Sequence, residues 1–202
     1  MATPDTQNRC PWCAGDDDYI KYHDNVWGVP TDDERELFEF LVLETFQAGL
    51  SWLTVLKKQK AFKEAFAQFD PEKVARFDKE KKQELLRNKG IIRNRLKINA
   101  AITNAECFLQ VQQQHGSFAG YLWGFVDHRQ KQNNFALMAE VPDNTPKAEE
   151  ISTALKKAGF KFVGPTIIYA YMQATGMVND HLTNCPRHTE IKNMAQGKKY
   201  GL

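Results

Sequence analysis

Cysteine and histidine residues near the two ends of the chain have the side chains needed to bind a metal ion. Cys10 and His23 lie near the start, whereas His181 and Cys185 lie near the end, four positions apart. One helical turn would bring His181 and Cys185 to the same side. Two thiolates and two imidazoles complete a tetrahedral zinc site with no open position. These residues therefore predict one structural zinc ion that joins segments far apart in the sequence.

Other uses of these residue types remain open. Cys10 and Cys13 form a Cys-x-x-Cys motif, as in redox proteins, although no alternation of strands and helices accompanies it. Cys13 or His188 could also replace one of the four ligands. The start of the chain lacks the basic end and apolar run of a signal peptide, so we expect a cytoplasmic protein with reduced cysteines. Reduced cysteines favour metal binding over disulfide bonds.

A segment rich in aromatic rings extends from Tyr19 to Gly28. Tyr19, Tyr22 and His23 are spaced so that one helical turn places all three on one face. Together with other rings of the chain they predict a flat-walled pocket for a planar ligand, built from Trp12, Tyr19, Tyr22, Trp27 and Trp52.

The candidate carboxylate for this pocket is Glu44, which follows the apolar run 40–43 and precedes a turn at 47–51. A glutamate in such a place is usually a solvated helix end. If the side chain points into the pocket instead, its carboxylate can accept hydrogen bonds from the exocyclic amine of a base. It can also stabilise a developing positive charge.

A glycine-containing turn with lysines beside it occupies residues 156–166 and separates two expected helices. Backbone N–H groups at such a turn, and at the start of the following helix, form an anion site that suits a DNA phosphate. The pattern alone is not specific, because any pair of helices joined by a tight turn would show it.

Length and composition are those of a globular domain: 202 residues, 42% hydrophobic and 26% charged. No apolar run approaches the length of a membrane span, so we expect no membrane association. The net charge of +2 does not by itself indicate a nucleic-acid partner. The segment from Lys79 to Lys97 is strongly basic, which is typical either of a nucleic-acid contact or of a solvated pair of helices.

Capping residues, breaking residues and apolar spacing predict an all-α fold. Thr31 and Glu34 form a capping box at the first long helix, and Gly90 and Gly116 are expected to end later helices. The expected helices are 31–44, 52–69, 71–88, 93–114, 117–126, 151–158 and 166–175, with a loop at 128–145. We expect a disordered N-terminus at 1–9, a helical domain at 10–185 and a flexible basic tail at 186–202.

Four segments, taken together and in order, resemble the bacterial 3-methyladenine DNA glycosylase I family of helix-hairpin-helix glycosylases. They are residues 22–30, 47–52, 159–164 and 178–181, and the resemblance extends from about Cys10 to Cys185. It implies a DNA repair enzyme that flips 3-methyladenine out of alkylated double-stranded DNA and hydrolyses its N-glycosidic bond. A monomer without an obligate protein partner is the simplest expectation.

The resemblance also implies roles for individual residues. The family's zinc clasp is matched by Cys10, His23, His181 and Cys185. Glu44 matches the acidic residue that contacts the extruded base, and the five aromatic residues match the base pocket, with Trp52 as the stacking platform. The DNA-binding positions are Gly49 and Leu50, in the loop pushed into the gap in the duplex, and Gly159, Lys161, Gly164 and Thr166, in the hairpin that grips phosphates.

The sequence departs from related glycosylases in two places. Asn179 stands where many helix-hairpin-helix glycosylases have a catalytic aspartate, so we assign no catalytic role to Asp180 and expect neither a lysine nucleophile nor lyase activity. Cys13 and the pair Thr45-Phe46 differ from the expected residues around the pocket, which leaves its fine selectivity open.

Two other functions fit some of these features. A zinc-clasped module that binds damaged DNA without turnover would have the same pocket. A zinc hydrolase would use His23 and His181 to hold a catalytic metal. Removal of a structural zinc is expected to unfold the protein, whereas removal of a catalytic metal would abolish activity alone.

Overall fold

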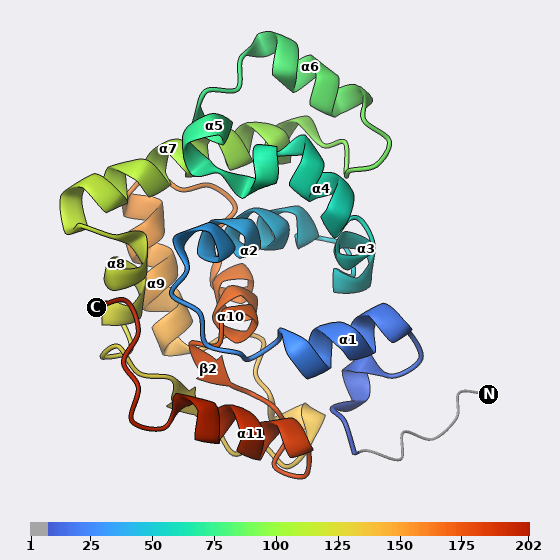
Figure 1. The fold of residues 1–202 in the computed structure, drawn as a ribbon, viewed down its shortest axis with the longest axis vertical. Helices are drawn as coiled ribbons and strands as arrows, with labels where there is room; N and C mark the ends of the chain where they lie inside the picture. The colour runs from blue at the N-terminus through green and yellow to red at the C-terminus, as the bar shows by residue number, and fades with distance from the viewer. Residues whose placement is uncertain (1–7) are drawn as a thin grey trace.

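The computed structural model describes residues 8–202, and the regular secondary structure in this part of the chain is almost entirely helical (Figure 1). The α-helices are α1 (Asp17–Asn25), α2 (Glu34–Gln47), α3 (Trp52–Leu56), α4 (Gln59–Ala65), α5 (Pro71–Ala75), α6 (Lys79–Arg87), α7 (Arg95–His115), α8 (Phe118–Gly124), α9 (Pro146–Lys157), α10 (Pro165–Ala174) and α11 (Pro186–Ala195). Short 3-10 helices are η1 (Pro11–Cys13), η2 (Ala67–Phe69) and η3 (Met138–Glu140). The strands β1 (Lys131–Gln132) and β2 (Val178–Asn179) form one short parallel pair. The predicted all-α class is confirmed.

Helix α2 runs through the middle of the molecule, packed against α7 and α10 (Figure 1). All of its residues from 37 to 46 are buried. Such burial is expected of a helix that is apolar around most of its circumference. It also takes two carboxylates, those of Glu39 and Glu44, out of water.

Side chains cap the start of most helices, which explains where the helices begin. For α2 the cap is Asp33, whose carboxylate accepts from the N–H groups of Arg35 and Glu36. The expected cap at Thr31 is therefore wrong by two residues, because the Thr31 hydroxyl donates to Glu36 instead. The other capping residues are Asp16, Ser51, Asp70, Asp78, Asn94, Ser117 and Thr145.

Two of the long helices expected from the sequence are divided. Residues 52–69 form α3, α4 and η2, and residues 71–87 form α5 and α6, with Asp78 as a second cap. The first of these expected helices ends in η2, at residues 67–69, where the backbone has positive φ angles between 52° and 57°. Gly90 is not the cap of α6. Asn88 ends that helix, and its side chain accepts from the Gly90 N–H.

The C-terminal segment is not the flexible tail that was expected. Residues 186–195 form α11, and the chain then returns to α8, where the ring of Tyr200 stacks on Trp123 with 4.7 Å between ring centres. The Tyr200 N–H donates to the His128 carbonyl, and the Gly201 N–H donates to Asp32. These interactions are long-range, which is why the basic composition of this segment did not predict them.

At the other end of the chain, the predicted disorder of residues 1–7 lies outside the described residues. Arg9, also expected to be disordered, pairs with Asp24 at 2.8 Å. No helix within residues 8–202 is long and apolar enough to cross a membrane.

Candidate metal centre and base pocket

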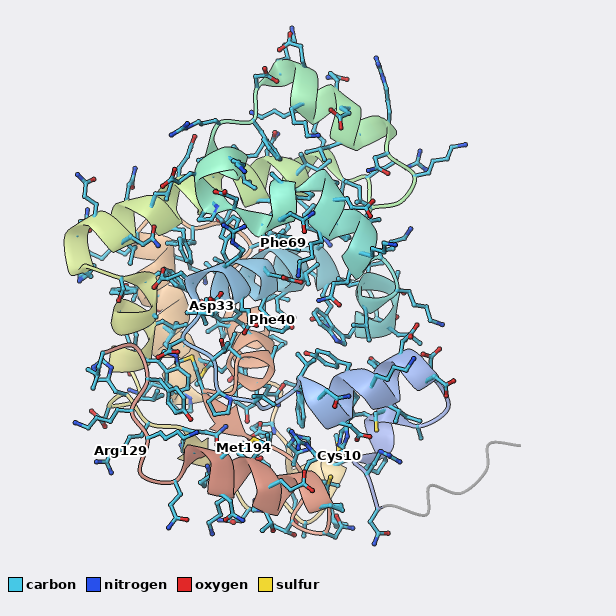
Figure 2. All side chains as sticks on the ribbon, viewed as in Figure 1. Cys10, Asp33, Phe40, Phe69, Arg129 and Met194 are labelled. Carbon is cyan, nitrogen blue, oxygen red and sulfur yellow. The ribbon has the colours of Figure 1, made fainter. Side chains whose placement is uncertain are left out.

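The four predicted metal ligands meet where the N-terminal segment approaches the segment before α11, near the position at which Figure 2 labels Cys10. Their donor atoms all lie within 4.8 Å of one another, and all four residues are buried. The Cys185 sulfur is 3.6 Å from His23 Nε2 and 3.8 Å from His181 Nδ1. A tetrahedral zinc ion with ordinary bond lengths requires sulfur–nitrogen separations of about 3.6 Å. The donor set therefore fits a metal ion of this kind.

The second nitrogen of each imidazole is held by a neighbouring oxygen. His23 Nδ1 lies 2.8 Å from the Asp24 carboxylate, and His181 Nε2 lies 3.0 Å from the Trp27 carbonyl. Each oxygen accepts a hydrogen bond from the N–H of its ring, which leaves the lone pairs of His23 Nε2 and His181 Nδ1 to bind a metal. Gly28 permits this arrangement, because a Cβ there would lie 3.1 Å from His181 Nε2.

The two cysteines are also arranged to supply a thiolate. A hydrogen bond from the Cys10 thiol stabilises the thiolate of Cys185 and lowers the pKa of Cys185 despite burial. The thiolate is the form that binds metals. Cys13, the alternative ligand in sequence terms, instead directs its thiol at the Cys10 carbonyl, 3.1 Å away.

A cavity of about 430 Å³ opens beside the metal centre, and all five predicted aromatic residues line it together with Glu44. The ring of Tyr22 lies 5.3 Å from that of Trp52, and the ring of Trp12 lies 5.0 Å from that of Trp27. The remaining lining residues come from α2, α10 and the segments near η3 and β2: Gln47, Met138, Val141, Pro142, Asp143, Thr166, Tyr169, Ala170, Gln173 and Asp180.

Glu44 is the chemically unusual member of this lining. Its side chain is buried, and among the described residues its Oε2 atom has no hydrogen-bond partner. Burial raises the pKa of Glu44 to about 8. The Nε1 donor of Trp52 is likewise buried without a partner in the described chain. Buried polar atoms are normally paired, so an unpaired acceptor and an unpaired donor at one cavity indicate a polar ligand.

Asp180 is a pocket residue whose position the sequence did not predict. Its Oδ2 accepts from the Tyr169 hydroxyl at 2.5 Å and from Gln173 Nε2 at 2.8 Å, and its Oδ1 accepts from Asn133 Nδ2 at 2.6 Å. Both oxygens are therefore paired, unlike Glu44 Oε2. The i, i+4 spacing of Tyr169 and Gln173 was the available sequence signal, since it places both side chains on one face of α10.

The predicted DNA-binding residues lie in two loops. Gly49 and Leu50 form the turn between α2 and α3, where Gly49 has a φ of +79° and Leu50 is 42% exposed. The second loop is the hairpin 158–164 between α9 and α10, which contains Gly159, Lys161 and Gly164. Only Thr166, at the start of α10, also lines the cavity.

The hairpin is held by buried side chains. The Asn104 amide on α7 accepts from the Lys161 N–H at 2.7 Å and donates to the Lys161 carbonyl at 3.0 Å. The Ser152 hydroxyl donates to the Val163 carbonyl at 2.6 Å. The backbone of the hairpin is therefore fixed while the side chain of Lys161 stays exposed.

Comparison with known proteins identifies close relatives. Residues 12–188 match the family model described as methyladenine glycosylase. The chain is 49% identical over 177 residues to DNA-3-methyladenine glycosylase 1 of Escherichia coli strain K12, covering 88% of this chain and 95% of the relative. It is 44% identical over 181 residues to DNA-3-methyladenine glycosylase of Haemophilus influenzae, covering 90% of this chain and 98% of the relative.

Solved structures agree with these relatives. A crystal structure of 3-methyladenine DNA glycosylase I superposes with a TM-score of 0.86 at 50% identity, covering 88% of this chain and 98% of the other. The Staphylococcus aureus enzyme, from a structure on 3-methyladenine recognition, superposes with a TM-score of 0.86 at 38% identity, covering 89% and 96%.

Proposed function

The chain belongs to the methyladenine glycosylase family, and on this premise we propose that it excises 3-methyladenine from alkylated double-stranded DNA by hydrolysing the N-glycosidic bond. The observation that carries the proposal is the unpaired, buried oxygen of Glu44 in a cavity walled by aromatic rings. Such a site suits a planar base that carries a positive charge.

Recognition of the cation follows from the lining of the cavity. An adenine alkylated at N3 is positively charged, and a flipped base can stack against Trp52 and Tyr22. The faces of electron-rich rings favour a cation by about 0.5–2 kcal/mol per good contact. The positive charge also favours the ionised form of Glu44, whose carboxylate can then accept from the exocyclic amine. Neutral adenine would offer no such compensation for burying the carboxylate.

The reaction itself needs little chemical assistance. The cationic base is already a good leaving group, so no strong acid has to protonate it. Water adds to the sugar carbon, the carbon–nitrogen bond breaks, and its electron pair neutralises the base while a proton passes to solvent. Glu44 stabilises the positive charge and positions the base throughout.

We propose that no lyase step follows. The cavity lining formed by residues 8–202 contains no lysine, so it offers no amine that could attack the sugar carbon. Asp180 has both oxygens occupied by donors from the protein and is therefore not assigned as a base.

DNA is held outside the cavity in this proposal. The N–H groups at the end of the hairpin, after Lys161, and those in the first turn of α10 would bind backbone phosphates, assisted by the side chain of Lys161. The loop at Gly49 and Leu50 would enter the space left by the flipped nucleotide. Flipping costs a few kcal/mol, which the apolar side chain of Leu50 would help to offset.

The metal is proposed to be one structural zinc ion held by Cys10, His23, His181 and Cys185. Four protein ligands fill a tetrahedral site and leave no position for a reactive water. This favours a clasp over the catalytic metal of a zinc hydrolase. The protein is proposed to act as a monomer on its DNA substrate.

The test is chromatography of bases released from methylated duplex DNA by zinc-loaded protein. Free 3-methyladenine should appear, and strands should stay intact until alkali is added. Unmethylated duplex serves as the control. Folded, zinc-loaded protein that binds methylated DNA without releasing a base would be a damage-binding module and not a glycosylase.

A further inference from the structure

The ammonium group of Lys97 is buried at the base of the loop that follows α2. Lys97 lies in the first turn of α7, is 6% exposed, and donates to the Phe46 carbonyl at 2.8 Å and to the Ala48 carbonyl at 2.5 Å. No carboxylate within residues 8–202 forms an ion pair with it. Burial lowers the pKa of Lys97. A buried cation paired only with neutral carbonyls is costly and requires an explanation.

The end of α2 explains why a cation is stable there. The last carbonyls of a helix lack partners within the helix, and the helix dipole places a partial negative charge on them. The last turn of α2 contains no basic residue, and Ala48, which follows it, is not a glycine cap. Lys97 therefore supplies from α7 the hydrogen bonds and the positive charge that α2 lacks.

These carbonyls belong to the segment that links the pocket to the predicted insertion loop. Glu44 lies one turn before Ala48, and Trp52 begins the next helix. Between them Gly49 adopts a positive φ, and a Cβ there would meet nothing within 4 Å in the described chain. The side chain of Leu50 is exposed. Lys97 thus anchors, from the protein interior, a turn whose own backbone hydrogen bond joins the Leu50 N–H to the Gln47 carbonyl.

We propose that Lys97 is a positioning residue that holds the Ala48–Leu50 turn in the conformation in which Leu50 enters the duplex. The inference rests on the proposed function, because the turn has this task only in an enzyme that flips a base. A turn displaced by about 1 Å can reduce the rate by about 100-fold even though no reacting group is lost. The base pocket itself does not require Lys97, which is absent from its lining.

The test compares Lys97→Met with Lys58→Met. Lys58 is a matched control, because its Nζ also donates to two loop carbonyls, those of Lys89 and Gly90, away from the pocket. For Lys97→Met we expect kcat/KM for base release from methylated duplex DNA to fall about 10- to 100-fold. Binding of free 3-methyladenine should change by less than about twofold. Lys58→Met should leave both quantities unchanged.

A double-mutant cycle with Leu50→Ala separates positioning from general structural support. If Lys97 acts through the turn, Lys97→Met should add little further loss once Leu50 has been truncated. Fully additive losses, or an equal loss of free-base binding, would overturn the proposal. Should Lys97→Met not fold, the same comparison is made with Lys97→Gln, whose amide is uncharged and reaches one bond less far, so it should still give a measurable loss of kcat/KM.

The two proposals fail in different ways. Wild-type protein that releases no base would overturn the proposed function and, with it, the role of Lys97. Active wild-type protein together with a fully active Lys97→Met or Lys97→Gln variant would overturn only the positioning role.

Discussion

Glu39 and Glu44 lie on the same buried helix, and only Glu39 has protein partners for both carboxylate oxygens. Glu39 accepts from Gln59 Nε2 at 2.8 Å and pairs with Lys63 at 3.3 Å. Glu44 faces the cavity, and within the described chain its Oε2 has no partner. The protein supplies hydrogen-bond partners to the carboxylate of Glu39, whereas Glu44 Oε2 can gain a partner only from a ligand in the cavity. This difference is the physical basis of the proposed function.

The free energy of unfolding should decrease as the pH rises, because Glu44 is buried in its protonated form. Glu44 has a pKa of about 8 in the folded protein and about 4.5 when unfolded, so unfolding between these values releases a proton. Rising pH therefore favours unfolding, and stability should decrease by a few kcal/mol between about pH 4.5 and pH 8. Glu44→Gln should lack this decrease and be the more stable protein at pH 9. Urea unfolding at several pH values tests this, and parallel profiles would contradict it.

Removal of the metal is expected to unfold the protein. The four ligands join residue 10 to residue 185, so the clasp holds the N-terminal segment against the segment that precedes α11. Chelation, or Cys185→Ser, should lower the free energy of unfolding by several kcal/mol. Circular dichroism and a zinc assay on the same sample provide the measurement. A chelated protein that keeps its melting temperature but loses activity would indicate a catalytic metal instead.

Gly28→Ala should weaken the metal site. Gly28 has a φ of +79°, which costs a residue with a Cβ about 1–2 kcal/mol, and the added Cβ would lie 3.1 Å from His181 Nε2. Gly15→Ala is the matched control, because Gly15 has a similar φ of +90° but would place its Cβ in open space within the described structure. Zinc affinity should fall only for Gly28→Ala. Equal zinc affinity in both variants would rule out the contact with His181.

Asn104→Ala should loosen the DNA-binding hairpin. The change removes both hydrogen bonds to the backbone of Lys161 and leaves its partly buried N–H and carbonyl unpaired, at a cost of about 2–3 kcal/mol. Affinity for duplex DNA should decrease, while binding of free 3-methyladenine should not change. Fluorescence anisotropy with a labelled duplex gives the first quantity, and equilibrium dialysis gives the second. Unchanged DNA affinity would remove the hairpin from the proposed interface.

The sequence predicted those parts of the site that depend on residue type and local spacing. The ligands Cys10, His23, His181 and Cys185 and the rings around Tyr22 were identified in this way, and the structure brings each set together. The helical class also followed from capping and periodicity.

What the sequence did not predict depends on contacts between distant segments. The network of Asp180 with Asn133 and Tyr169 forms only when β1, β2 and α10 are packed together. The stacking of Tyr200 on Trp123 converts an apparently solvated tail into ordered structure. The sequence did not predict that the helices end after α3 and α5, because apolar residues continue at helical spacing across both positions.

The most direct test of the central claim is the single-turnover rate of 3-methyladenine release by Glu44→Gln and Glu39→Gln, measured beside wild-type protein on the same methylated duplex. The unpaired carboxylate is predicted to matter to the reaction and the paired one only to the fold. Glu44→Gln should therefore lose about 100-fold or more in rate, and folded Glu39→Gln should stay within about tenfold of wild type. A Glu44→Gln protein with the wild-type rate would contradict the account.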